Sequence, residues 1–146
     1  RGDLFRRLIV NGQVEMGFEL SAEALAQLNL RYAIATTVAE MYLAGGFTVV
    51  YQDIIIGQTL VEIIAKLQQH RLYVVVLCPE PTVVAEREAG RRKRGYRQET
   101  DVINFDRVLR EETPQIGLWL DTSTLTVAET VDTILVQIEQ ARVGAG

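Results

Sequence analysis

Three short apolar runs stand out along the chain, and helix-like segments separate them. The runs cover residues 48–53, 72–78 and 117–122, with the sequences TVVYQD, LYVVVLC and GLWLDT. None of them alternates strictly between apolar and polar residues, and continuous apolar strands are typical of parallel sheets covered on both faces. We therefore expect three buried parallel strands.

Apolar residues at spacings of three and four predict helices around these strands. Ser21 is placed to cap the start of the first helix, and Gly45 is placed to end it. The last helix opens on the capping box Thr126-Val-Ala-Glu129. The helices are expected over residues 22–43, 59–69, 101–113 and 126–142.

Strands that alternate with helices predict right-handed crossovers, and hence an α/β three-layer sandwich with a parallel sheet. The chain has 146 residues and no linker that would divide it, so we expect a single domain over 1–146. Ligands of open parallel sheets lie beyond the carboxyl ends of the strands. Polar residues occur at these expected ends: Asp53, Asp121, Thr122 and Ser123.

Composition narrows the function classes. A net charge of −4 disfavours a nucleic-acid binder. No apolar run approaches the roughly 18 residues of a membrane span, and no signal peptide is visible, so we expect a cytoplasmic protein without membrane partners. Cys78 is the only cysteine and lies in an apolar run, which predicts a buried, reduced thiol. His70 is the only histidine, which excludes histidine-based metal sites and Ser-His triads.

Asp53 is the first candidate for chemistry. A carboxylate at the end of an apolar strand is placed to orient Mg²⁺ or its water shell beside a nucleotide. The alternative is a carboxylate that caps the following turn.

Asp3 is the second candidate, in the segment Arg1-Gly-Asp-Leu-Phe-Arg-Arg7. Its carboxylate is able to accept the proton of an attacking hydroxyl, while Arg6 and Arg7 hold an anionic substrate. The alternatives are a helix N-cap followed by two solvated arginines, or an Arg-Gly-Asp adhesion motif.

A basic segment follows residue 86. Arg87, Arg91 and Arg94 share one face if the segment is helical, and several converging guanidiniums favour a bound anion such as a triphosphate. Gly90 and Gly95 bracket the basic run as hinges would, so we expect a lid at about 90–98 that is ordered by nucleotide. The alternative is a solvated face offset by neighbouring glutamates.

These features in this order resemble the ATP-binding small-molecule phosphotransferases of the P-loop kinase superfamily, the group related to chloramphenicol phosphotransferase. The resemblance covers nearly the whole chain and depends on the order and spacing of its segments rather than on one motif. The segments are residues 1–7, 46–53, 72–79, the basic segment to Tyr96, 110–114 and 117–123.

The resemblance implies an enzyme that uses ATP and Mg²⁺ to phosphorylate a hydroxyl of a small molecule. Asp3 would be the base or a carboxylate on the metal side, Arg6 or Arg7 would hold the acceptor, and Asp53 would be the Walker-B-like acid. The residues implied at the nucleotide are Arg87 against adenine, Arg91 and Arg94 as a catalytic lid on the phosphates, and Thr122 and Ser123 beside the adenine pocket.

One part of the family pattern is missing. These kinases open with a strand and the loop G-x-x-x-x-G-K-[ST], whose N–H groups and lysine hold the phosphates, and the 146 residues contain no such motif. We expect that strand and loop upstream of Arg1, and expect this segment alone to be inactive. The alternative is a module without a P-loop that binds a nucleotide or a protein without catalysis; an upstream Gly-rich loop ending in Lys-Ser or Lys-Thr decides between them.

Overall fold

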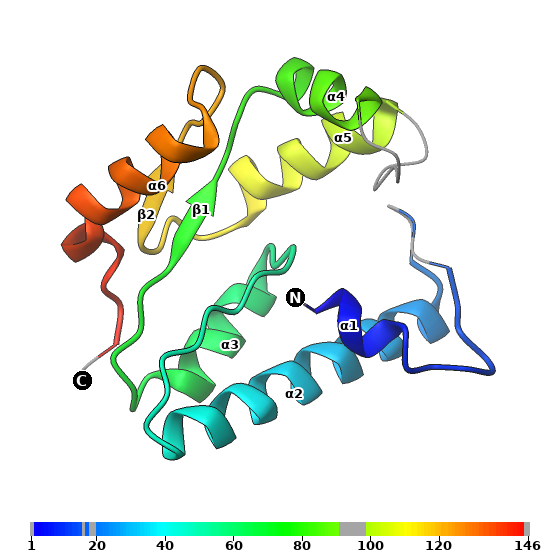
Figure 1. Cartoon of the computed structure of the whole chain (residues 1–146). Helices are drawn as coiled ribbons and strands as arrows, with labels where there is room; N and C mark the ends of the chain where they lie inside the picture. Colours follow the sequence, from blue (N-terminus) through cyan, green and yellow to red (C-terminus); the bar gives the residue numbers. More distant parts are fainter. Residues whose placement is uncertain (1, 16, 18–19, 91–98, 145–146) are drawn as a thin grey trace.

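The structure is a computed structural model that describes residues 2–15, 17, 20–90 and 99–144. It is a mixed α/β protein, mostly helical, with a small parallel sheet of two strands (Figure 1). The elements in chain order are α1 (Asp3–Arg6), α2 (Ala22–Ala44), α3 (Gln58–Leu67), β1 (Val75–Leu77), α4 (Pro81–Ala89), α5 (Glu99–Arg107), the π-helix η1 (Val108–Glu112), β2 (Leu118–Leu120), α6 (Val127–Val136) and the 3₁₀-helix η2 (Ile138–Ala141).

The long helix α2 begins and ends where its capping residues predict. Ser21 Oγ accepts a hydrogen bond from the N–H of Ala24 at 3.1 Å, which satisfies one of the free donors at the helix start. At the other end Gly45 is the C-cap, and its N–H donates to the carbonyl of Met41 at 3.1 Å. Both capping predictions are confirmed.

A small apolar core joins α2 to α3. Tyr32, Ile63 and Leu67 are buried against one another. Partly buried apolar residues surround them: Leu28, Tyr51, Ile55 and Leu72. The hydroxyl of Tyr32 also donates to the carbonyl of Ile54 at 2.6 Å. The segment after α2 is therefore held against α2 by packing and by a hydrogen bond.

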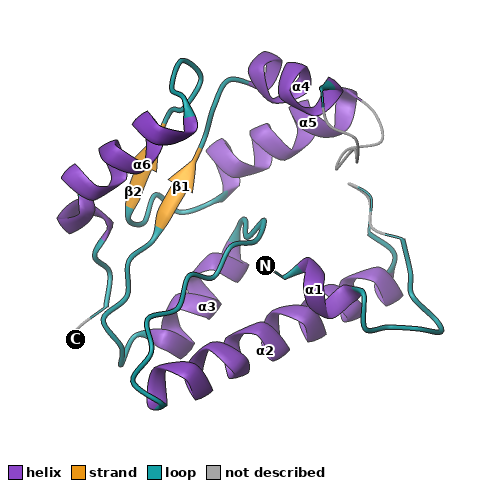
Figure 2. Ribbon diagram, in the orientation of Figure 1, coloured by secondary structure: helices purple, strands orange, loops and turns teal. Residues whose placement is uncertain are grey.

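Two of the three apolar runs form the sheet (Figure 2). β1 and β2 are parallel, with Val75 opposite Leu118 and Leu77 opposite Leu120. The pairing extends beyond both strand ends, since the N–H of Leu118 donates to Val74 and the N–H of Cys78 to Leu120, both at 2.9 Å. The parallel pairing of these two runs is confirmed, and Cys78 is a buried free thiol as expected.

The third run differs from its prediction. Residues 48–53 are extended but form no strand, and within the described part of the chain no backbone ladder pairs with them. Val50 is 87% exposed, whereas Tyr51 packs against the core between α2 and α3, so only one side of this extended segment is covered. Residues with high strand propensity are those whose side chains pack well on a half-buried sheet. Without an adjacent strand, the same residues remain a loop.

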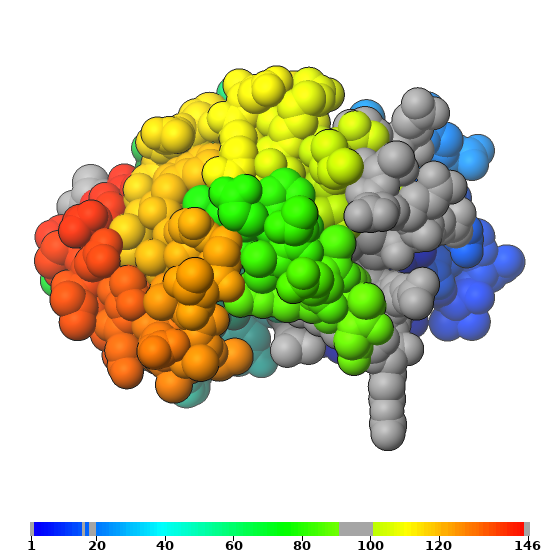
Figure 3. Space-filling model, turned by 90° about the horizontal axis from the view of Figure 1, so that it is seen from above, coloured from blue at the N-terminus to red at the C-terminus, as the bar shows by residue number. Residues whose placement is uncertain are grey.

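The segment predicted as one helix over 101–113 is helical from Glu99 to Glu112, as α5 continued by the π-helix η1. The last helix ends sooner than predicted, because α6 stops at Val136 before the 3₁₀ turn η2. The capping box of α6 is confirmed, with Thr126 and Glu129 bonded reciprocally. β1 and β2 run between α5 and α6 in Figure 1, and α4, α5 and α6 share one face in the space-filling view (Figure 3).

Candidate functional site

Gly2 brings the start of α1 against Asp53. Gly2 is buried, and its N–H donates to the carbonyl of Gln52 at 3.2 Å. A Cβ atom at this position would overlap the Asp53 carboxylate, so only glycine fits without a shift of the chain. The contact joins two segments that are fifty residues apart in the sequence.

Asp53 is buried and paired with an arginine that sequence reasoning missed. Its side chain is 7% exposed, and Oδ1 accepts hydrogen bonds from Arg31 Nη2 at 3.0 Å and from the N–H of Ile54 at 2.9 Å. Oδ2 is buried and has no hydrogen-bond partner among the described residues. Burial raises the pKa of Asp53, and the charge of Arg31 and the bond from Ile54 oppose that rise.

Arg31 links Asp53 to Asp3. The side chain of Arg31 is 10% exposed and lies over the ring of Tyr32, with its central carbon 5.3 Å from the ring centroid. Its Nη1 is 3.8 Å from the carboxylate of Asp3, whose side chain is 65% exposed. The two carboxylates that the sequence singled out therefore face the same guanidinium, one buried and one open to solvent.

Asp3 does not cap a helix. Gly2 is the N-cap of α1 and makes no side-chain cap bond, while Asp3 is the first residue within the helix. The N-cap alternative for Asp3 is therefore wrong, because its position one residue later points the carboxylate toward Arg31 instead.

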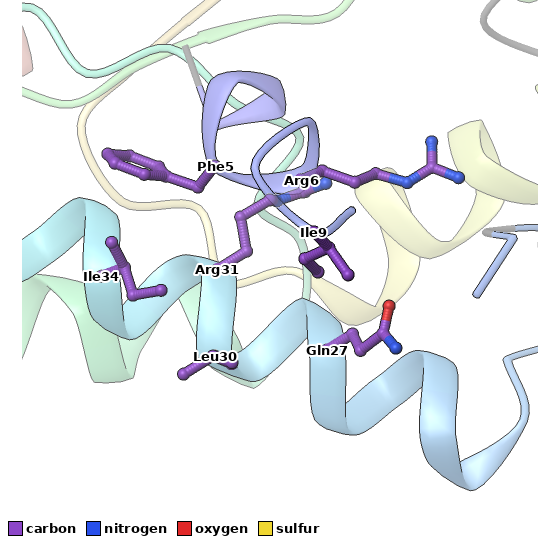
Figure 4. A pocket seen from close by; sticks show the side chains of 7 residues that line it. All are labelled: Phe5, Arg6, Ile9, Gln27, Leu30, Arg31 and Ile34. Carbon is purple, nitrogen blue, oxygen red and sulfur yellow. The ribbon is translucent and has the colours of Figure 1, made fainter. Parts of the chain in front are cut away.

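A pocket lies between the α1 region and α2 (Figure 4). Phe5, Arg6 and Ile9 line one side of it, and α2 supplies the other side with Gln27, Leu30, Arg31 and Ile34. In Figure 4, Phe5 and Arg6 extend in opposite directions from α1. Of the two arginines proposed to hold a substrate, Arg6 lines this pocket, whereas Arg7 is exposed at the end of α1.

The loop after α1 is held by hydrogen bonds to two residues that line the pocket. Gln27 donates to the carbonyl of Gly12 at 2.7 Å and accepts from the N–H of Val14 at 3.0 Å. Arg6 Nη2 donates to the carbonyl of Val14 at 3.4 Å. These polar contacts fix the loop to α2 and to α1.

A second cluster joins the residues proposed to bind nucleotide. Arg87 Nη2 in α4 donates to the carbonyls of Thr122, Ser123 and Leu125, at 2.8, 3.3 and 3.4 Å. Thr122 is buried and Ser123 is half-buried. Three residues from segments 35 residues apart thus meet at the end of β2.

The turn of this second cluster has its own polar support. Ser123 Oγ accepts from the N–H of Glu80 at 2.8 Å and donates to Asp121 Oδ1 at 2.5 Å. The hydroxyl and the N–H of Ser123 together lower the pKa of Asp121. These bonds fix the turn after β2 to the start of α4.

The expected lid is the part of the proposed site that the structure does not describe. Arg91, Arg94 and the rest of the expected lid beyond Gly90 lie outside the described residues. Among the described residues, no ion pair or hydrogen bond joins the Asp3–Arg31–Asp53 cluster directly to the Arg87–Thr122–Ser123 cluster.

The residues around Asp53 offer few ligands to Mg²⁺. Across the described residues no group of three His, Cys, Asp or Glu side chains is placed to hold a metal ion. Mg²⁺ commonly keeps several waters and takes only one or two carboxylates besides phosphate oxygens. Oδ2 of Asp53 is buried against Gly2, so it presents no open ligand to a hydrated Mg²⁺, and the described residues around it do not fit a metal site.

Comparison with family models, with curated proteins and with solved structures finds no match for this chain. None of the described helices has the length and apolar character needed to cross a membrane.

Proposed function

We propose that this chain is part of an ATP-dependent phosphotransferase that transfers the γ-phosphoryl group to a hydroxyl of a small molecule. The observation that carries the proposal is the Asp3–Arg31–Asp53 cluster beside the pocket. An exposed carboxylate near a pocket, oriented by an arginine that is itself held by a buried acid, supports a role for Asp3 as general base toward a molecule in that pocket.

Each residue of this first cluster has a role in the proposed reaction. Asp3 accepts the proton of the acceptor hydroxyl as its oxygen bonds to the γ-phosphorus, and ADP leaves with the bridging oxygen. Asp53, the proposed Walker-B-like acid, holds Arg31 and through it positions Asp3. Arg6 holds the acceptor in the pocket, and Arg7 remains at its rim.

The second cluster is proposed as the adenine side of the site. Arg87 presents a guanidinium plane whose Nη2 is held by three carbonyls, and a fixed plane suits stacking on a purine. Thr122 and Ser123 border that pocket. Arg91 and Arg94 are proposed to close on the phosphates as part of a lid at 90–98.

The proposed enzyme needs a phosphate-binding loop that these residues do not contain. The sequence holds no G-x-x-x-x-G-K-[ST] motif, so the loop and its strand must be supplied to this chain. We infer a three-layer P-loop kinase core as the complete fold, a single domain over 1–146 of that core, and a cytoplasmic location where ATP is available.

The second candidate is a nucleotide- or protein-binding module without catalysis. The pairing of Asp53 with Arg31 favours it, because a carboxylate that is neutralised by an internal arginine attracts a cation less strongly. Under this proposal the Arg87 cluster binds a nucleotide, and Asp3 has no proton to accept.

Transfer assays on the full-length gene product separate the two candidates. Radiolabelled γ-phosphate from ATP is followed into a panel of hydroxylated metabolites and antibiotics. Asp3→Asn is expected to lower transfer by about 10²- to 10⁴-fold while ATP affinity stays within twofold. Asp132→Asn, a remote exposed change in α6, is the matched control and should transfer normally. ATP binding without transfer to any acceptor would support the module.

A further inference from the structure

The pocket between α1 and α2 carries polar atoms that no described residue satisfies. The Nε atoms of Arg6 and Arg31 are both buried and lack a hydrogen-bond partner among the described residues. Both side chains line the same pocket, and that of Arg31 is nine-tenths buried. Buried donors are nearly always paired, so two unpaired N–H groups at one pocket indicate a missing acceptor.

The charges favour an anionic acceptor. Arg31 is compensated by Asp53 and Asp3, at 3.0 and 3.8 Å. Arg6 has no carboxylate within ion-pair distance in the described part of the chain, and its Nη2 donates to the carbonyl of Val14. Its charge is therefore left for a ligand, and a guanidinium bonds most strongly to a carboxylate or another oxyanion.

The rest of the pocket is apolar. Leu30 and Ile34 lie one turn apart on α2 and are 55% and 37% exposed, although they are large hydrophobic side chains. Ile9 and Phe5 face them from the α1 side. A ligand that covers these four side chains has an apolar body, such as an aromatic ring or a short branched chain.

The position of Asp3 indicates where a hydroxyl group of the ligand would lie. Its carboxylate faces Arg31, which lines the pocket, and it lies three residues before Arg6 on the same helical turn. When the anionic group of a molecule contacts Arg6, another part of the same molecule therefore lies near Asp3.

We propose that this pocket binds a small amphipathic hydroxy acid, with its anionic group on Arg6, its apolar body against Leu30 and Ile34, and its hydroxyl toward Asp3. The assignment of this molecule as the phosphoryl acceptor rests on the proposed function. The binding itself does not.

Titration of the full-length gene product with para-hydroxyphenylacetate, without ATP, tests the pocket. NMR of the Ile methyl groups should show shifts at Ile9 and Ile34. The neutral isostere para-hydroxyphenylacetamide should bind about tenfold more weakly, since it forfeits one charge-assisted hydrogen bond. Glycolate, which keeps the acid and the hydroxyl but lacks the ring, should also bind at least fivefold more weakly.

Variants assign the loss to particular side chains. Arg6→Gln should weaken the acid to the level of the amide and leave the amide unchanged. Leu30→Gln should weaken both compounds, while Arg71→Gln, an exposed arginine outside the pocket, should leave both unchanged. If Arg6→Gln fails to fold, the acid–amide comparison on the unaltered protein still decides the matter.

Equal affinities for acid and amide, or methyl shifts that avoid Ile9 and Ile34, would overturn the pocket assignment. Selective binding of the acid in a protein that transfers phosphate to no acceptor would leave the pocket standing and refute the proposed function. Phosphate transfer to neutral alcohols and to no hydroxy acid would leave the proposed function standing and refute the assignment of this pocket as the acceptor site.

Discussion

Removal of the guanidinium of Arg31 should reveal how much of the fold depends on the buried ion pair with Asp53. Arg31→Met keeps the aliphatic part of the side chain and leaves Asp53 as a buried charge without its cation. The two side chains are 10% and 7% exposed and 3.0 Å apart, so solvent screens them little. Loss of one partner from such a pair costs about 3–5 kcal/mol.

Smaller contributions add to this cost. The contact from Arg31 to Asp3 contributes at most about 1 kcal/mol, because Asp3 is mostly exposed. The contact with the Tyr32 ring contributes a similar amount. We expect a loss of about 4 kcal/mol in the free energy of unfolding at neutral pH, out of a total of roughly 5–15 kcal/mol for a domain. Urea denaturation followed by circular dichroism measures it.

The loss should depend on pH. Burial raises the pKa of Asp53 above its ordinary value of 3.8, so its contribution to stability is fully present below that value and is lost as pH rises through the folded pKa. Without Arg31 that pKa rises further. The destabilisation of Arg31→Met is therefore largest at neutral pH and shrinks toward about pH 4 as Asp53 takes up a proton.

Two further variants make the interpretation refutable. Asp53→Asn in the Arg31→Met background removes the stranded charge and should recover most of the loss. Arg107→Met removes an ion pair whose side chains are at least half exposed, and should cost less than about 1 kcal/mol. A cost for Arg31→Met as small as this control, or a cost that is independent of pH and of Asp53→Asn, would refute the reasoning.

Three other changes have definite expected outcomes. Gly2→Ala should destabilise the protein by about 1–3 kcal/mol in a thermal melt, since its methyl group collides with the Asp53 carboxylate and the backbone must shift; a melt like that of the unaltered protein would contradict the contact. Thr126→Ala should cost about 1 kcal/mol through loss of the capping box, whereas Thr124→Ala, just before it, should cost little. Arg87→Ala should weaken ATP binding to the full-length gene product by about tenfold in calorimetry, and unchanged affinity would exclude Arg87 from the adenine site.

Local signals predicted the starts of α2 and α6 well because the contacts that cap them are local, whereas α1 and α4 were not among the expected helices. The cap of α2 depends on Ser21 and Ala24, three residues apart, and the capping box of α6 on Thr126 and Glu129, also three apart. Such contacts are visible in a short stretch of sequence. The end of α6 was overestimated because the turn from Ile138 onward tightens into a 3₁₀-helix, which has nearly the same apolar spacing.

The strand predicted over residues 48–53 shows the opposite case. Its residues suit a strand, but a strand exists only when another backbone accepts and donates its hydrogen bonds. Residues 75–77 and 118–120 have each other, and residues 48–53 have no such neighbour within the described part of the chain. The amino-acid composition of a segment does not show whether a second strand lies beside it.

The sequence singled out the two acids of the candidate site, Asp3 and Asp53, but not the arginine between them, Arg31. Asp53 was found because it ends a predicted strand, and Asp3 because two arginines follow it in a short charged segment. Arg31 lies inside a long helix, where an arginine is usually solvated. The one available signal was its position next to Tyr32, the buried centre of the α2 face. An ion pair between residues 22 positions apart follows only from the path that returns the chain from Gly45 along α2 to Asp53.

The choice between Arg6 and Arg7 follows from the same geometry. Neighbouring residues on a helix point about 100° apart, so only one of the two arginines can face α2. Gly2 fixes which one, because its contact with Asp53 sets the rotation of the short α1 helix and directs Arg6 toward the pocket. The buried acid thus acts on the pocket without lining it: it holds Arg31, accommodates Gly2, and through them orients both Asp3 and Arg6. A substitution at Asp53 should therefore weaken the binding of para-hydroxyphenylacetate as well as lower stability, although Asp53 does not line the pocket.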